Sequence, residues 1–549
     1  MSRERSPDRF HPLESITPPP AILEDTTVND IQESITLRPR LVTEAIRRDI
    51  GTARNREEAQ ERETEVEPRR SQRNRGPAEI FHQRANVALM AKVVESEPQS
   101  LTEALSSDNK AEWRRAWESE LASLAKNNTW VVEPLPKDRT AIGCRWLFQR
   151  KQDGRYKARL VAKGYGQRQG IDYEETFAPV AKFTTIRLLL ALTCESNCEV
   201  CGMDVKTAFL NSELAETVYM ELPEGVTIPA ETSRSPGYRQ PMACRLLKSI
   251  YRLKQSPQAW YGRINNFFLS NGFSRSDADH SLFIHYDHQV ILLLYVDDLV
   301  LAAPTLNQID WIRTKLNQEF EMTDLGEIQS FLGLEIERNR SGRTLFLSQT
   351  QYIYKILHDH GMQDCNPVNS PADPHIRLEK SSPTFQATDT ERRRYQSAVG
   401  SLMYAMLGTR PDISYAVSKV SQYSTNPNTI HWTAVKRIFR YLAGTLNRGL
   451  YFGIQEMGRG FTDADWGSGD DRKSIGGFTF LLNGAAISWN SKKQSTVALS
   501  STEAEYMALT QATKESIWLQ ALLYDLGARK HIPEISHILI DNQGALALV

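Results

Sequence analysis

The chain has 549 residues, of which 40% are hydrophobic and 24% charged, and its formal net charge is −1. That length exceeds a single hydrophobic core, so we expect several domains, and the near-zero net charge excludes a strongly basic protein although not a local basic channel. No apolar run is as long as a membrane span, no signal peptide opens the chain and the six cysteines have no regular spacing, which together favour a soluble intracellular protein with free thiols.

Residues 1–80 are polar, rich in Pro, Glu and Arg, and lack a sustained apolar period. Such a segment cannot bury enough apolar surface to offset its chain entropy, so we expect a disordered linker or tail. Order is predicted to begin near Ser100, because Leu101, Trp113 and Leu121 follow a helical period from there.

The next segments predict short strands and helices in alternation. CRWLFQRKQDGRYKARLVAKGY predicts a hairpin that turns at the Asp-Gly pair 153–154. FTTIRLLLALTCE predicts a buried helix, and CGMDVKTAF predicts a strand that ends near Asp204. KQSPQAWYGRINNFFLSNGF predicts a helix with Ser256 as its N-cap, Pro257 at its first position and Gly272 after its end.

The segment LLLYVDDLVLA places two aspartates, Asp297 and Asp298, inside an apolar run. Burying unpaired carboxylates is costly, but at the tip of a hairpin the two side chains can leave the hydrophobic flanks. A turn with solvated aspartates explains this segment by itself, because Asp is a common turn residue. Asp204, also at the end of an apolar strand, favours a second interpretation.

Carboxylates brought together from two strands form an oxygen site of the kind that Mg²⁺ prefers. Two such ions about 3.5–4 Å apart can activate an attacking hydroxyl and stabilise the leaving oxygen in a phosphoryl transfer. The ions would also neutralise the repulsion between adjacent aspartates. This interpretation requires that the fold bring Asp204 to the Asp297–Asp298 turn.

The second half of the chain changes character twice. Residues from about 350 to 455 are predicted to be mostly helical, with breaks at NPVNSPADP and STNPN. FTDADWG, GGFTFLLNG and AAISWNSKK then predict strands, and a long helix is expected from about Ser501 to Leu526. ISHILIDNQGALALV predicts a strand that enters a helix.

The chain resembles the polymerase of copia-type retrotransposons. KARLVAKGYGQRQGIDYEETFAPVAKFTTIR, MDVKTAFLNSELAETVYMELPEG, LLKSIYRLKQSPQAWY, YVDD and FLGLEIE follow one another in that family's order and approximate spacing, and the resemblance runs from about residue 75 to the end. It implies an α+β multidomain fold: a right-hand-like polymerase (fingers, palm, thumb) followed by an incomplete ribonuclease H-like mixed α/β domain. The expected domains are a disordered linker or tail (1–80), reverse transcriptase fingers and palm (81–350), a helical thumb or connection (351–455) and a C-terminally truncated ribonuclease H-like domain (456–549).

The resemblance implies roles for individual residues of the polymerase. Asp204, Asp297 and Asp298 match its three catalytic acids and metal ligands, with Asp298 in a supporting role. Phe209 matches the aromatic ring under the incoming sugar, where a 2′-OH would clash. Outside this motif, Phe209 would be an ordinary core residue.

Further nucleotide and primer contacts are implied on three other segments. Gln255 matches the position that contacts the sugar or base of the incoming nucleotide, and Gly333 lies in FLGLEI, which resembles the hairpin that grips the primer terminus. Lys157 and Arg159 match the fingers hairpin, where their charges can bind triphosphate oxygens. A solvated strand face explains these two cations equally well.

Arg252 departs from the family pattern, because the family usually has Gly at this place in IYRLKQ. Gly often marks a backbone with positive φ or a close approach, which Arg does not adopt freely. Arg252 would either disturb the nucleotide pocket or add a phosphate contact.

From about residue 456 the chain resembles the ribonuclease H domain of the same elements, in GFTDADWG, ISWNSKKQSTVALSSTEAEYMAL and LIDNQGA. The resemblance implies a second two-metal site whose catalytic and metal-binding acids are Asp463, Glu505 and Asp541. Asp465 and Glu503 are interpreted as surface or capping residues. Relatives continue beyond Val549 with a fourth carboxylate and a closing helix, so we expect poor or absent hydrolysis of RNA in hybrids.

The leading hypothesis is an RNA-directed DNA polymerase that uses Mg²⁺, two ions per site, with Mn²⁺ as an alternative. Its expected partners are an RNA template, a DNA primer, the RNA/DNA hybrid, deoxynucleoside triphosphates and the integrase, protease and capsid parts of a polyprotein, but no membrane. The expected location is the cytoplasm, in a virus-like particle, or the nucleus. Two alternatives stay open: a catalytically decayed relic that at most binds nucleic acid, and an unrelated nucleotidyltransferase, which would leave LKQSP and FLGLEI unexplained.

Overall fold

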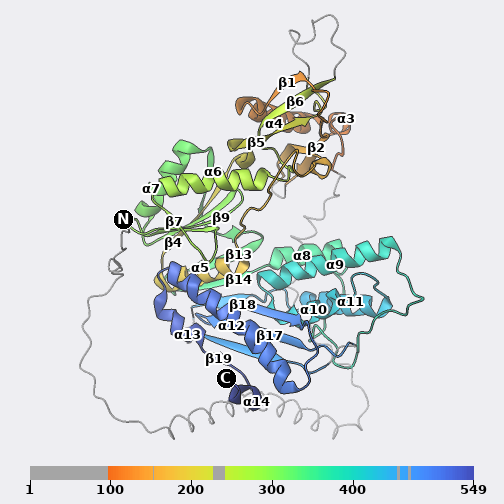
Figure 1. Cartoon of the computed structure of the whole chain (residues 1–549), viewed down its shortest axis with the longest axis vertical. Helices are drawn as coiled ribbons and strands as arrows, with labels where there is room; N and C mark the ends of the chain where they lie inside the picture. Colours follow the sequence, from red (N-terminus) through yellow and green to blue (C-terminus); the bar gives the residue numbers. More distant parts are fainter. Residues whose placement is uncertain (1–96, 152–153, 227–240, 454–457, 468–470) are drawn as a thin grey trace, which may run out of the picture. The chain divides into compact units, whose positions relative to one another are not determined.

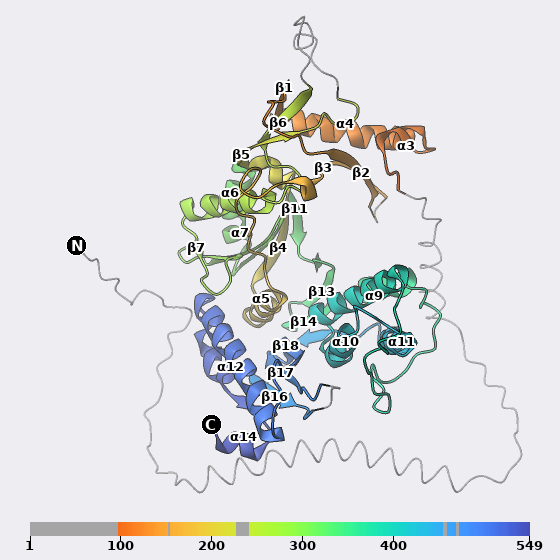
Figure 2. The ribbon, with the colours of Figure 1, turned by 45° about the vertical axis from the view of Figure 1, so that its right-hand side comes forward.

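The computed structural model describes residues 97–549, apart from 152–153, 227–240, 454–457 and 468–470. The tail expected over residues 1–80 therefore lies outside the described residues. The described strands form five sheets, and helices cover them (Figures 1 and 2).

The first described elements are two helices and two small sheets. Ser100 caps the first described helix by accepting a hydrogen bond from the Glu103 N–H, and Leu101, Trp113 and Leu121 lie in helices as predicted. The bounds are α3 (Leu101–Ser106) and α4 (Lys110–Lys126), β2 (Cys144–Arg150) paired with β3 (Tyr156–Ala162), and the sheet of β1 (Trp130–Pro134), β6 (Met242–Lys248) and β5 (Glu213–Met220). The β2–β3 hairpin confirms the predicted pairing, with Gly154 at φ +84° in its turn.

The central sheet has six strands in the order β11-β4-β10-β9-β8-β7. Its strands are β4 (Glu199–Val205), β7 (Ser274–Arg275), β8 (Leu282–His285), β9 (Val290–Tyr295), β10 (Asp298–Ala303) and β11 (Met322–Glu327). Apolar side chains leave both faces: Leu292 and Leu294 join one core, whereas Leu293 joins another. The sheet is therefore covered on both sides, since successive side chains of a strand point to opposite faces.

Three helices cover this sheet: α5 (Phe183–Ser196), α6 (Ser256–Ser270) and α7 (Leu306–Glu319). The leucines of α5 share a core with one face, while α6 and α7 pack on the other (Figure 1). The predicted N-cap of α6 is wrong by one residue. Gln255 is the N-cap, because the Ser256 hydroxyl donates to the Ile250 carbonyl at 2.6 Å. Gly272 follows the helix at φ +86°, as predicted.

A small antiparallel sheet leads into the predicted helical region. Its strands are β12 (Ser330–Phe331), β13 (Leu334–Asn339), β14 (Thr344–Ser348) and β15 (Leu450–Phe452), and the helices are α8 (Thr350–Asp359), α9 (Asp389–Gly408), α10 (Ser414–Ser421) and α11 (Thr429–Gly444). β15 lies beyond these helices in sequence but pairs with β14. The helical region is thus inserted between two strands of one sheet.

The last sheet confirms the predicted strands and is mixed, with β19 parallel to β16 and the other pairs antiparallel. Figure 2 shows α12 lying along it. The elements are β16 (Arg459–Ala464), β17 (Ile475–Leu482), β18 (Ala485–Lys493), β19 (Ile538–Leu539), α12 (Ser501–Asp525), α13 (Ile532–Ser536) and α14 (Gln543–Ala547).

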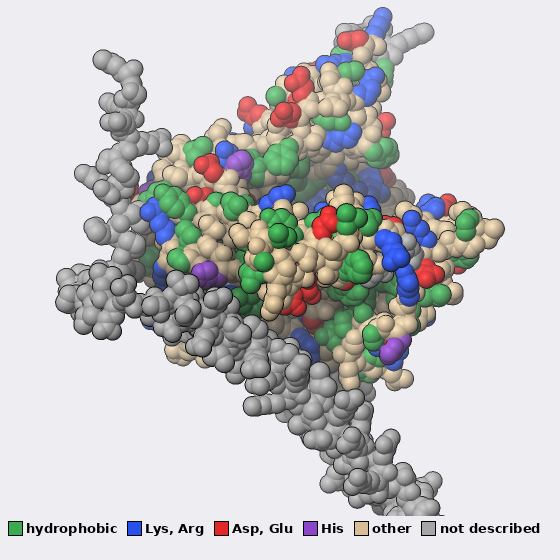
Figure 3. Space-filling model, turned by 60° about the horizontal axis from the view of Figure 1, so that its bottom comes forward, with side chains coloured by type: hydrophobic (Ala, Val, Ile, Leu, Met, Phe, Trp, Pro, Cys, Tyr) green, Lys and Arg blue, Asp and Glu red, His purple; other side chains and the backbone are tan. Residues whose placement is uncertain are grey.

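All six cysteines lie in described segments and are free thiols, as expected. Among the described helices, none is both long and apolar enough to cross a bilayer. Figure 3 shows acidic and basic side chains interspersed over the face that it draws, in keeping with the net charge of −1.

Candidate functional site

The two adjacent aspartates lie at the tip of the β9–β10 hairpin. Tyr295 pairs with Asp298, so Val296 and Asp297 form a two-residue turn, with Val296 at φ +57°. On the other side of β10, Asp298 pairs directly with Asp204 of β4. Directly paired residues of neighbouring strands point to the same face, so these two carboxylates are neighbours. The predicted meeting of Asp204 with this turn is confirmed.

Burial and mutual repulsion perturb these acids. Burial, and then the charges of Asp297 and Asp204, raise the pKa of Asp298 to about 6. Burial and then the charge of Asp297 also raise the pKa of Asp204. Both pKa values are raised by burial and by neighbouring negative charge, and a bound cation would neutralise that charge.

Helix α6 fixes the turn that carries Val296 and Asp297. The Trp260 indole N–H donates to the Val296 carbonyl at 2.6 Å, and Trp260 is 1% exposed in the core shared by α6 and the sheet. Asp297 also contributes its carbonyl, which accepts from the Val205 N–H at 2.8 Å. The sequence did not single out Trp260, although its place three residues after LKQSP was a usable signal.

An aromatic pair lies beyond the acids, on the 3₁₀ helix η2 (Ala208–Asn211) and the loop before α6. Phe209 meets Tyr251 edge to face, with ring centroids 5.1 Å apart. The Arg159 guanidinium carbon lies 4.7 Å from the centroid of the Tyr251 ring. Phe209 and Arg159, which the sequence proposed from separate segments, are therefore linked through Tyr251, which it did not propose.

The β2–β3 hairpin carries the predicted cations on β3. Burial, followed by the charges of Arg159 and Lys151, lowers the pKa of Lys157, while Glu120 and Asp204 oppose that shift. Glu120 of α4 is 9% exposed, and burial raises its pKa despite the opposing charges of Arg159 and Lys157. Glu120 is a group that sequence analysis missed, because no local pattern links residue 120 to residue 157.

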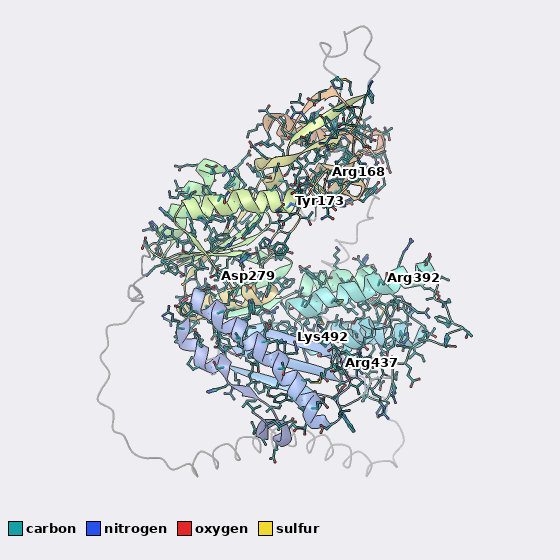
Figure 4. All side chains as sticks on the ribbon, in the orientation of Figure 1. Arg168, Tyr173, Asp279, Arg392, Arg437 and Lys492 are labelled. Atoms are coloured by element: carbon teal, nitrogen blue, oxygen red, sulfur yellow. The ribbon has the colours of Figure 1, made fainter. Side chains whose placement is uncertain are left out.

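Gln255 occupies a closed position. Its side chain is 2% exposed, its amide donates to the Asp172 carbonyl at 2.7 Å, and its oxygen accepts from Gln167 at 2.9 Å. The neighbouring Lys254 ammonium lies 4.7 Å from the Tyr173 ring centroid, and Figure 4 labels Tyr173 beside the first turn of α6. The contact of Gln255 with a nucleotide stays a prediction.

Two further predicted positions have left-handed backbones. Arg252 has φ +69°, so the family's usual Gly matches the conformation seen here. Its carbonyl lies against Gly164, where a Cβ would come within 2.1 Å of that oxygen. Gly333, at φ +69°, turns the β12–β13 hairpin, and the preceding Leu332 carbonyl accepts from the Tyr404 hydroxyl.

A second acidic group lies on the last sheet. Carboxylate oxygens of Asp463, Glu505 and Asp541 lie within 4.8 Å of one another, which confirms that the fold gathers the three predicted acids. Among the described residues, Asp204, Asp297 and Asp298 do not form a three-carboxylate group this close. Glu505 is 5% exposed, and its Oε2 is buried without a hydrogen-bond partner. Burial and then the charge of Asp463 raise the pKa of Glu505 to about 7, against a lowering hydrogen bond from the Ala464 backbone.

Asp465 and Glu503, interpreted from the sequence as surface or capping residues, bind backbone N–H groups. The Asp465 carboxylate accepts from the Ile475 N–H at 2.6 Å, and the Glu503 carboxylate accepts from the Leu499 N–H at 2.6 Å. The Ser500 hydroxyl oxygen accepts from the Glu503 N–H at 3.1 Å, so Glu503 lies at the capped start of α12.

A cationic groove of about 1020 Å³ lies between α10, α11, the loop before α9 and the loop after β16. Arg437, labelled in Figure 4, lies in its wall and pairs with Asp373 at 2.9 Å. Six cations line the groove: Arg377, Lys419, Lys436, Arg437, Arg440 and Arg472. Asp373 is the acidic residue in this lining. Sequence analysis left such local basicity undetermined, because the six cations come from separate segments.

Comparison with known proteins gives a consistent family. Residues 127–374 match the family model of the reverse transcriptase (RNA-dependent DNA polymerase). The chain is 43% identical over 444 residues to the Retrovirus-related Pol polyprotein from transposon TNT 1-94 of Nicotiana tabacum, an alignment that covers 78% of this chain and 33% of that protein. It is 42% identical over 469 residues to the Pol polyprotein from transposon RE1 of Arabidopsis thaliana, covering 83% of this chain and 30% of the relative.

A shorter relative is covered completely. The chain is 34% identical over 322 residues to a putative transposon Ty5-1 protein of Saccharomyces cerevisiae, an alignment that covers 57% of this chain and 100% of that protein. By contrast, the chain spans about a third of the Pol polyproteins that it matches. These matches, together with the acids and the order of their strands, show that the chain belongs to the reverse transcriptase family of copia-type retrotransposon Pol polyproteins.

Proposed function

We propose that the chain is an RNA-directed DNA polymerase that copies RNA into DNA. The observation that carries this proposal is the direct pairing of Asp298 with Asp204, beside the turn that holds Asp297. In this proposal the six-stranded sheet is the palm, the β2–β3 hairpin belongs to the fingers, α8–α11 form the thumb or connection, and the last sheet is the ribonuclease H-like domain.

Asp204 and Asp298, two neighbouring carboxylates with raised pKa values, suit hard divalent cations, since Mg²⁺ prefers oxygen ligands. Asp204 and Asp297 would hold two Mg²⁺ ions, with Mn²⁺ as an alternative, and Asp298 would support them. When bound, the ions lower the pKa of the primer 3′-hydroxyl and stabilise charge on the phosphoryl group. The hairpin turn, fixed by Trp260, keeps the carboxylates in place without a reorganisation cost at the moment of reaction.

Other residues of the site bind and select the nucleotide in this proposal. Lys157 and Arg159 attract the triphosphate, and Phe209 excludes a 2′-hydroxyl by its ring. Gln255 supports the nucleotide from the N-terminus of α6, and the hairpin around Gly333 holds the primer terminus.

The test is extension of a DNA primer on an RNA template with Mg²⁺ and deoxynucleotides. We expect product from the natural sequence and a loss of at least about 10³-fold in Asp297→Asn, because a metal ligand is removed. Asp287→Asn is the matched control, since Asp287 is an exposed aspartate in the β8–β9 turn, at the opposite end of β9, and should keep full activity.

Absence of product from folded protein would refute the polymerase proposal. Retained binding of an RNA/DNA hybrid would then favour the decayed relic. A preference for DNA over RNA templates would instead favour another nucleotidyltransferase.

A second proposed activity is cleavage of the RNA strand in a hybrid, and the unpartnered Glu505 Oε2 favours it. Asp463, Glu505 and Asp541 fit a pair of Mg²⁺ ions, because the three carboxylates converge around a buried acceptor atom. Cleavage that disappears in Glu505→Gln while primer extension persists would establish a separate site. Absence of cleavage by folded protein would refute this second activity.

The other parts of the polyprotein are proposed partners, in accordance with the Pol polyproteins that this chain matches. Expression of the chain with the remaining polyprotein segments, followed by copurification, tests this. A cytoplasmic particle or the nucleus is the proposed location, to be tested by fractionation.

A further inference from the structure

Tyr251 lies at the centre of a three-residue contact that joins the proposed sugar pocket to the proposed triphosphate site. Its ring meets Phe209 at 5.1 Å between centroids and 79° between planes. The Arg159 guanidinium carbon lies 4.7 Å from the centroid of the same ring. Tyr251 therefore contacts one residue proposed to read the sugar and another proposed to bind phosphate.

The backbone of Tyr251 is held by a hydrogen bond and by pairing with β3. Its carbonyl accepts from the Ala162 N–H at 3.0 Å, and Tyr251 forms a parallel bridge with Val161 of β3. The following residue, Arg252, turns the chain at φ +69°, and its carbonyl lies against Gly164. The loop before α6 is thus fixed to the end of β3 at Tyr251 and lies against Gly164, which follows β3, at Arg252.

The chemical state of Tyr251 suits a contact residue rather than a proton donor in the reaction. Burial raises the pKa of the Tyr251 hydroxyl to about 12, against the lowering charge of Arg159. The phenol is therefore neutral at physiological pH, and its ring offers an unperturbed π-face to the guanidinium and an aromatic contact to Phe209.

We propose that Tyr251 is a positioning residue that sets the discrimination between deoxynucleotides and ribonucleotides by holding the Phe209 ring in place. The inference rests on the proposed polymerase function. A 2′-hydroxyl is rejected by Phe209 to the extent that its ring cannot rotate away, and the Tyr251 contact supplies that restraint. Because the Arg159 guanidinium also lies over this ring, loss of the ring also loosens the proposed triphosphate contact.

The experiment measures kcat/KM for single incorporation of a deoxynucleotide and of the matching ribonucleotide in primer extension. In Tyr251→Leu, the ratio of the two values should fall about 3- to 10-fold, the size of an aromatic edge-to-face contact. Tyr251→Phe keeps the ring and should keep the ratio. Tyr251→Met is a second ring-free variant of similar volume, in case the leucine variant fails to fold.

Tyr173→Leu is the matched control. Tyr173 also lies under a cation, with the Lys254 ammonium 4.7 Å from its ring centroid, but no described ring contact joins it to Phe209. Its loss should change both kcat/KM values alike and leave their ratio unchanged. An unchanged ratio in folded Tyr251→Leu and Tyr251→Met would overturn the inference, whereas absent deoxynucleotide incorporation by the natural sequence would refute the polymerase proposal itself.

Discussion

At the scale of single residues, the left-handed position at Arg252 shows how one departure from a family pattern is accommodated. Its φ of +69° belongs to a region that costs an L-residue about 1–2 kcal/mol. The side chain is exposed, so no packing offsets this cost. The fold instead holds the turn through contacts of its neighbours, including the hydrogen bond from Ala162 to the Tyr251 carbonyl.

Arg252→Gly should therefore raise stability by about 1 kcal/mol, since the strain removed exceeds the extra entropy of Gly in the unfolded chain. Urea unfolding measures this change in stability, provided that the unfolding free energy depends equally on urea concentration in both proteins. Arg252→Ala is the matched control: it also removes the exposed side chain but keeps a Cβ at positive φ, so it should bring no gain. Equal effects of the two variants would show that the side chain, and not the backbone, matters.

The residue types of the motifs and their order in the sequence were enough to identify the candidate acids. The pairing of Asp298 with Asp204 could not be obtained in the same manner, because strand register between β4 and β10 depends on contacts about 90 residues apart in sequence. Motif order identified the acids, whereas only the fold shows that two of them share one face. Tyr251 was missed for a related reason, since its importance comes from Phe209 and Arg159 on other segments.

At the scale of elements, α5 connects two sheets through polar side chains that its sequence did not explain. FTTIRLLLALTCE was predicted as a buried helix and is one, but Arg187 within it is 3% exposed. Its guanidinium donates to the Ile487 carbonyl at 2.8 Å and to the Gly408 carbonyl at 2.9 Å. These acceptors lie more than 200 residues away in sequence, so apolar period alone predicts the helix but not what it holds.

A second contact of α5 is ionic. Glu195 meets His531 of the 3₁₀ helix η4 (Arg529–His531) with 2.8 Å between Oε2 and Nε2, and Lys530 reaches the other carboxylate oxygen at 2.6 Å. The hydrogen bond to His531 contributes most to lowering the pKa of Glu195, to about 2. Glu195, followed by Glu534, raises the pKa of His531.

This pair should stabilise the chain in a defined pH window. The His531 contribution is fully present below its unfolded pKa of about 6.5 and is lost as pH rises through the raised folded value. The Glu195 contribution is present above an unfolded pKa of about 4.3 and is lost as pH falls toward 2. The contact is therefore strongest between about pH 4.5 and 6.5.

His531→Gln should lower stability by about 1 kcal/mol at pH 6 and by much less at pH 9. Thermal unfolding of both proteins at the two pH values measures the difference, with His280→Gln, an exposed histidine, as the control. If the difference in stability between His531→Gln and the natural sequence is the same at pH 6 and pH 9, the ionised pair is not the source of that difference.

At the scale of the whole molecule, a net charge of −1 coexists with a groove lined by six cations. Averaging over the chain hides that groove, which composition therefore could not reveal. Lys436 of α11 and Arg472 of the loop after β16 line the groove from separate elements, and both are exposed. If the chain binds an RNA/DNA hybrid as proposed, the phosphate backbone is the chemical partner that such a groove fits.

The double variant Lys436→Gln/Arg472→Gln should weaken hybrid binding at low salt. Because it removes two phosphate contacts, fewer counterions are released when the hybrid binds. Its slope of log K against log salt should become shallower by about 2, and each single variant should account for about 1. Lys110→Gln/Arg114→Gln is the matched control, since it removes two exposed cations of α4 outside the groove and should leave the slope unchanged. Equal slopes for the double variant and the natural sequence would place the bound hybrid elsewhere, and primer extension in the same proteins would then show whether polymerisation is independent of the groove.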